Sequence, residues 1–119
     1  MAALSFSVFR KKVESGAKRQ TIRAKRKYPI KKGDKLFLWW KQRSSERAKL
    51  GEAICTSVQD VTIEVKWVRV GDLLISGDIA LDRFAIADGF DNFGYMIDFF
   101  SDTHGLPFTG DLIKWDEII

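Results

Sequence analysis

Residues 61–81 read VTIEVKWVRVGDLLISGDIAL, and this stretch decides the class of fold that we predict. Apolar residues at the odd positions from 61 to 67 alternate with polar ones, which is typical of a half-buried strand. Residues 68–70 prolong that strand. The glycine-aspartate pairs at 71–72 and 77–78 indicate turns, each followed by a short apolar strand, at 73–75 and 79–81. Strands this short and closely spaced favour a small barrel over a parallel sheet with long helical crossovers.

The rest of the sequence predicts further strands and a few short helices. The run at 36–40, after the Gly33-Asp34 turn, is apolar on both faces and indicates a strand buried on both. Asp91 is a good N-cap for a helix that continues to about residue 103. The other expected strands span residues 4–9, 19–24, 50–57 and 112–115, and helical turns span 10–15 and 82–87. We therefore predict an α+β fold, a small mixed β-barrel flanked by short helices.

Length and composition indicate one domain over residues 1–119. The chain is 45% hydrophobic and 13% aromatic, so it has enough apolar surface to build one core and to offset the entropy of ordering the chain. No internal repeat and no low-complexity linker divides it.

Charge is distributed very unevenly along the chain. Residues 1–50 carry sixteen Lys or Arg and three acidic residues, a net charge of +13, whereas residues 51–119 carry four and thirteen, a net charge of −9. If the basic half forms one face, its field would attract a polyanion such as RNA. Alternatively, the two halves neutralise each other across the fold. The charged run Lys25, Arg26 and Lys27 is the first candidate for contacts with a polyanion.

Several classes of site are excluded by residue counts. Cys55 and His104 are each the single residue of their type, so the chain has no disulfide pair and no cysteine-based zinc site, and no motif in it indicates a Ser-His-Asp triad or a Cys-His pair. We accordingly expect neither a metal nor a cofactor. The first residues are apolar and the basic ones follow, the reverse of a secretory signal, and no apolar run approaches membrane-spanning length. The expected location is the cytoplasm, without a membrane partner.

A glycine, a lysine, a hydroxyl and an arginine follow one another at Gly16, Lys18, Thr21 and Arg23. These residues could place a base, a nucleophile and an anion clamp around one pocket, or they could be the solvated start of a strand. Geometry adds a condition, because residues three apart in a regular strand point to opposite faces. Lys18 must therefore lie in the irregular segment after Gly16, or at a bulge, if it is to act together with Thr21.

Four short motifs along the chain together resemble an ASCH domain. They are Gly16-x-Lys18-x-x-Thr21-Ile22-Arg23, Gly33-Asp34-x-Leu36, Gly51-Glu52 and Asp88-Gly89-Phe90, and they span nearly the whole chain. ASCH domains are similar to PUA domains. The resemblance implies a PUA-like β-barrel flanked by helices, with a cleft suited to RNA or a modified nucleoside.

The resemblance covers RNA-binding modules, proposed ribonucleases and small amidohydrolases that act on N4-acetylcytidine. For the last group it implies Lys18 as base, Thr21 as nucleophile and, at the position of the family glutamate, Asp88 as acid, with a side chain one methylene shorter. Lysine can serve as a base only if desolvation or nearby positive charge, here from Arg19 or Arg23, lowers its pKa. The alternatives without a functional role are that Lys18 is a solvated surface residue, Thr21 an ordinary strand residue and Asp88 a turn residue.

We rank binding of RNA or a nucleoside-type ligand first, in a cleft between residues 18–23 and 88–92. Hydrolysis of an acylated nucleoside in the same cleft is second, and a protein-interaction domain is third. For binding we add Trp40, whose ring could stack on a base, and Arg43, which is suited to phosphate contacts, as is Arg47. The sequence leaves the oligomeric state open.

Overall fold

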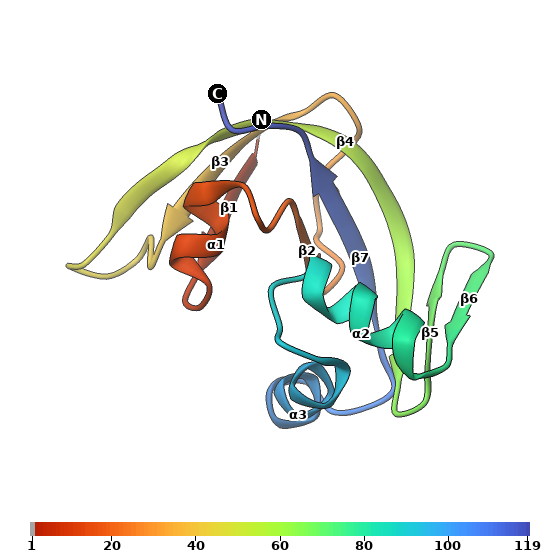
Figure 1. Ribbon diagram of the computed structural model, residues 1–119. Helices are drawn as coiled ribbons and strands as arrows, with labels where there is room; N and C mark the ends of the chain where they lie inside the picture. The colour runs from red at the N-terminus through yellow and green to blue at the C-terminus, as the bar shows by residue number, and fades with distance from the viewer. Residues whose placement is uncertain (1) are drawn as a thin grey trace.

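Strand β4 (Ala48–Glu64) is 17 residues long and connects the two parts of the sheet. Its first part pairs with β3 (Lys35–Trp40), and its last residues pair with β5 (Trp67–Val70). Strand β7 (Phe108–Trp115) pairs antiparallel with β4 and also with β2 (Gln20–Arg23). The computed structural model describes residues 2–119, and Figure 1 shows how strongly β4 curves between the two parts.

The sheet has seven strands and mixed pairing. The path runs β1-β3-β4-β5-β6, where β1 (Ala2–Phe6) is parallel to β3, and β6 (Leu73–Ser76) is antiparallel to β5. The sheet is not closed, so a barrel is not shown. Three short helices complete an α+β fold: α1 (Arg10–Ser15), α2 (Asp78–Ala87) and α3 (Phe93–Thr103).

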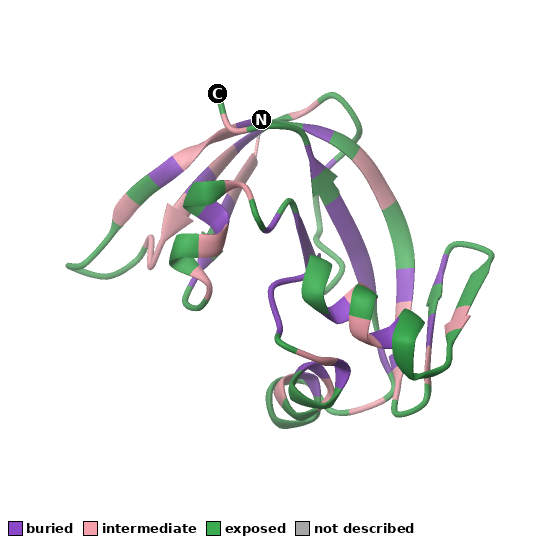
Figure 2. Ribbon diagram, in the orientation of Figure 1, coloured by how far each residue is buried: buried purple, intermediate pink, exposed green. Residues whose placement is uncertain are grey.

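Two hydrophobic clusters lie along the curved sheet. One cluster joins α2 and α3 to β2, β5, β7 and the end of β4, with Met96, Ala85 and Ile63 among its fully buried members. The other joins α1 to β1, β3 and the start of β4 around Leu36 and Leu38. Figure 2 shows buried residues along β7, which contributes to both clusters.

The helix starts differ from the predictions in two places. Residues 79–81, predicted as a strand, belong to α2, which begins at Asp78 and includes the turn predicted at 82–87. Leu81 and Ala85 are its buried residues, and their spacing of four is helical. A run of three apolar residues after a turn is too short to distinguish the pattern of a strand from that of a helix. For α3 the N-cap is Asn92, not Asp91: its side chain accepts a hydrogen bond from the Tyr95 amide at 2.9 Å.

The strand boundaries also differ from the predictions. The strands predicted at 50–57 and 61–70 are instead one long β4 followed by a two-residue turn at 65–66 and then β5. Buried positions change from odd, Val61 and Ile63, to even, Val68 and Val70. The alternation in the sequence continued through the turn because Val65, which is 54% exposed, keeps the apolar pattern without being in the core.

Candidate functional site

Three segments that are distant in the sequence meet at one place, and each carries a predicted site residue. Lys18 lies in the irregular segment between α1 and β2, which meets the geometric condition for its acting with Thr21. Thr21 is on β2, and Asp88 follows the last turn of α2. All three are buried polar residues.

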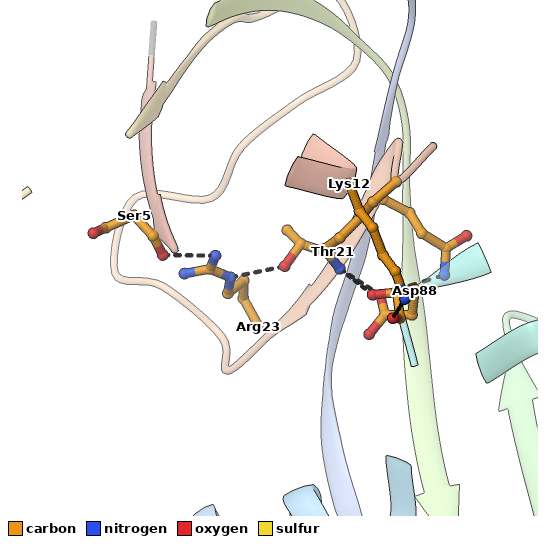
Figure 3. Close-up of polar contacts among 8 residues, drawn as sticks. Ser5, Lys12, Thr21, Arg23 and Asp88 are labelled. Carbon is orange, nitrogen blue, oxygen red and sulfur yellow. Dashed lines mark hydrogen bonds and ion pairs between the residues drawn. The ribbon is translucent and has the colours of Figure 1, made fainter. Parts of the chain in front are cut away.

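A buried ion pair joins Lys18 to Asp88. The Lys18 Nζ is 3.3 Å from the Asp88 Oδ1, and the two side chains are only 4% and 5% exposed. The same amine donates a hydrogen bond to the backbone carbonyl of Asp88, so it contacts this residue twice. Gln20 Nε2 donates to Asp88 Oδ1 at 3.4 Å (Figure 3). The carboxylate is therefore held by two side chains of the segment that precedes and begins β2.

Burial shifts the pKa values of this pair in opposite directions. Desolvation lowers the pKa of the Lys18 amine, against the attraction of Asp88, and the charges of Arg23 and Lys12 lower it further. Desolvation raises the pKa of the Asp88 carboxyl, against the effects of Lys18, Gln20 and Arg23. Each shift makes the charged form of its group less favourable than it would be in water, although the two groups form an ion pair. Such opposed shifts in one cleft are typical of an acid and base pair.

Thr21 is bound by a different set of contacts. Its Oγ1 accepts a hydrogen bond from Arg23 Nε at 3.0 Å, and an Arg23 terminal nitrogen donates to the Ser5 carbonyl at 2.9 Å (Figure 3). The guanidinium also lies over the Phe6 ring, 4.9 Å from its centroid. In the structure of residues 2–119, no hydrogen bond joins the Thr21 hydroxyl to Lys18 or to Asp88. Arg23 therefore orients the hydroxyl.

Glycine at position 89 allows the site to close. Its φ of 108° is in the region that favours glycine, and a Cβ there would lie 2.9 Å from the Phe9 ring and 3.2 Å from the Lys18 Cδ. Lys12 Nζ donates to the Gly89 carbonyl and is 3.7 Å from Asp91 Oδ1. The turn after α2 is thus held against both lysines.

A cavity of about 170 Å³ opens beside these groups. Its lining combines two kinds of side chain. The polar ones include Lys18, Thr21, Arg23 and Asp88, and the rings are those of Phe6, Phe9, Phe90, Phe99, Phe100 and His104. Phe9 and Phe90 meet edge to face with their centroids 4.9 Å apart. From here on, this space is called the cavity.

The residues predicted to bind nucleic acid are separated in the structure. Arg23 lines the cavity, whereas Arg19 is exposed, donates to the Gly16 carbonyl at 3.0 Å and lies away from the cavity. Lys25 forms ion pairs with Asp60 and Asp111, and these hydrogen bonds raise the pKa of its amine. Lys27 lies over the Tyr28 ring.

The other predicted residues, Trp40, Arg26 and Arg43, do not line the cavity. Trp40 is half-buried, with cations over its ring from Arg10 at 5.8 Å and Lys41 at 5.3 Å. Arg26 and Arg43 are exposed and line one groove together with Arg23. The charged run at 25–27 is therefore divided, because only Arg26 faces this groove.

Several residues that line the cavity or contact the ion pair were not predicted as site residues. Gln20 is one residue before Thr21, and a polar residue buried at the start of a strand has no pattern that distinguishes it from an exposed one. Ser5 contributes through its backbone carbonyl, which any residue could supply. Phe99 and His104 come from α3 and its end, where the sequence indicated only core packing and a helix terminus. Phe90, in contrast, belongs to the Asp88-Gly89-Phe90 motif.

No protein-family model, curated protein or solved structure matches this chain. Within residues 2–119, no cluster of three or more His, Cys, Asp or Glu side chains could hold a metal ion. In the same residues, no helix is long and apolar enough to span a membrane. The function therefore has to be argued from the geometry of the site.

Replacing both members of the buried ion pair should cost less than replacing each one separately. Lys18→Met or Asp88→Leu alone leaves a buried charge without its partner and should lower the free energy of unfolding by about 3 to 5 kcal/mol. The double variant should lose much less than the sum of the two, because neither charge remains. Urea unfolding of the four proteins measures this coupling.

Lys12 and Asp91 provide a matched control. Their side chains are 43% and 81% exposed, so Lys12→Met and Asp91→Leu should couple by less than about 1 kcal/mol. A coupling between Lys18 and Asp88 as small as that of the control would contradict the buried pair.

Proposed function

We propose that the chain is an ASCH-type domain that binds RNA or a nucleoside-type ligand in the cavity. The support is the order of the four motifs and the way the first and last of them, at 16–23 and 88–90, come together around one ion pair. A PUA-like barrel belongs to the same proposal. The strong curvature of β4 agrees with it (Figure 1).

The observation that carries the proposal is that rings and polar side chains line one small cavity. The rings offer a surface on which a base can stack, and the polar side chains offer donors and acceptors for the edge of that base. A volume of about 170 Å³ is below the usual range for drug-sized ligands, which is roughly 300 to 1,000 Å³. The cavity is therefore suited to one small ring system.

A second candidate function, hydrolysis of an acylated nucleoside, is favoured by the opposite pKa shifts of Lys18 and Asp88. For this path Lys18 has to lose its proton, a change that its lowered pKa makes easier, and its amine would then accept the Thr21 hydroxyl proton while Oγ1 attacks the acyl carbonyl carbon. The protonated Asp88 carboxyl would then donate its proton to the departing nitrogen as the C–N bond breaks. Water would finally hydrolyse the acyl ester on Thr21. This path requires the Lys18 amine to turn from Asp88 toward Thr21.

Nucleoside binding should depend on an aromatic residue that lines the cavity. Phe99→Leu should weaken binding of cytidine or N4-acetylcytidine by about 1 to 3 kcal/mol if the ring stacks on the base. Phe84→Leu makes the same change in a ring that packs against the same hydrophobic cluster without lining the cavity, so binding should be kept. Titration calorimetry gives both dissociation constants. Absence of binding to the wild-type chain, or equal losses in both variants, would refute the proposal.

Hydrolysis makes a separate prediction about the Thr21 hydroxyl. The wild-type chain should release cytidine from N4-acetylcytidine, Thr21→Val should abolish release, and Thr21→Ser should retain part of it. Thr62→Val, on β4, is the matched control and should keep the wild-type rate. Chromatography of the products follows the reaction. Unchanged release by Thr21→Val would exclude this residue as the nucleophile, and no release by any variant would leave binding as the function.

A further inference from the structure

An open groove of about 760 Å³ lies next to the cavity and is lined by four arginines: Arg23, Arg26, Arg43 and Arg47. Its remaining lining comes from the end of β2 and from β1 and the segment after β3: Ala3, Leu4, Ser5, Ala24 and Gln42. Arg23 and Ser5 line both spaces, so the groove and the cavity share a wall. We call this second space the arginine groove.

The arginine groove carries positive charge that the fold does not neutralise. None of its lining residues is acidic. Within residues 2–119, Arg26, Arg43 and Arg47 have no carboxylate within 4 Å, although Lys25, Lys35, Lys41 and Lys49 in the same basic half all form ion pairs. Glu46 lies in the same connection as Arg43 and Arg47, and it pairs with Lys41. Arginines from two stretches of chain, 23–26 and 43–47, thus line one groove with like charges, an arrangement that favours a bound anion.

Guanidinium groups are matched to phosphate. Their planar fork donates two parallel hydrogen bonds to an anionic oxygen pair, which an ammonium group cannot do. A free nucleoside has no phosphate and would leave all four arginines without an anionic partner. The groove beside the cavity therefore favours a ligand in which the base is attached to phosphate groups.

We propose that the ligand is a nucleotide within a single strand of RNA, with its base in the cavity and the neighbouring phosphodiesters in the arginine groove. This inference rests on the proposed function. Arg23 stands between the two spaces, where it contacts the Thr21 hydroxyl on one side and borders the groove on the other. A base inside a duplex cannot enter the cavity without leaving the stack, so unpaired strands are preferred. An acidic peptide could occupy the groove, but it would leave the rings of the cavity unused.

The test is binding of a fluorescein-labelled, mixed-sequence, single-stranded RNA nonamer, followed by fluorescence anisotropy between 50 and 200 mM salt. The wild-type chain should bind the nonamer more tightly than it binds cytidine or N4-acetylcytidine. In the triple variant Arg26→Gln, Arg43→Gln, Arg47→Gln, the affinity should fall by roughly tenfold or more at 50 mM salt. The slope of log K against log salt should become shallower by about two, because three phosphate contacts are lost.

A second triple variant removes the same amount of charge elsewhere. Lys66, Arg69 and Arg83 are exposed on the β4–β5 turn, β5 and α2, and Lys66→Gln, Arg69→Gln, Arg83→Gln should change the affinity little. Figure 1 shows β5 and the connection after β3 on opposite sides of the molecule. All six positions are exposed, so both proteins should fold, and thermal unfolding checks this.

The outcomes separate this inference from the proposed function. Equal losses in the two triple variants would mean that only net charge matters and would overturn the arginine groove as the phosphate site. A nonamer that binds no tighter than a nucleoside would also overturn it, while nucleoside binding that Phe99→Leu weakens would leave the proposed function standing. Tight nonamer binding that Phe99→Leu does not weaken would overturn the placement of the base in the cavity.

Discussion

The buried ion pair between Lys18 and Asp88 is the interaction on which the site depends. It ties the segment after Gly16 to the end of α2, seventy positions away, and thereby places two of the polar side chains of the cavity. Two charges with side chains only 4% and 5% exposed carry a desolvation cost that their attraction barely offsets. Such a pair adds little to stability compared with apolar residues of similar volume. Its position beside a cavity therefore argues for a functional role.

The basic half of the chain is divided by the fold into two kinds of charge. Some cations are neutralised locally, such as Lys25 between Asp60 and Asp111, which come from the acidic half. Within residues 2–119, others line the arginine groove without a carboxylate within 4 Å. Neutralisation across the fold is thus found at Lys25, whereas the arginine groove keeps the unneutralised charge that a basic binding face would need. The net charge of +13 over residues 1–50 could not show which side chain would take which role.

The sequence predicted most strands and the apolar stripe of α3, because burial on one face leaves a period that can be counted. It did not predict the continuity of β4 or the start of α2, where the apolar pattern ran through a turn or was too short. For the site, it set the condition that Lys18 lie outside a regular strand if it is to act with Thr21, and the structure meets that condition. The partnership of Lys18 with Asp88 came only from the family resemblance. Contacts made by backbone atoms, such as the Ser5 carbonyl, cannot be recognised in a pattern of residue types, because any residue could supply them.

The central claim is that residues 18–23 and 88–90 form one ligand site that continues into the arginine groove. Two-dimensional amide NMR of the labelled chain, titrated with the unlabelled RNA nonamer, tests it most directly. Our account predicts that the shifted amides cluster at those two segments and at residues 42–47, while those of β6 (Leu73–Ser76) stay in place. Shifts that gather on β6, or that avoid residues 88–90, would contradict it.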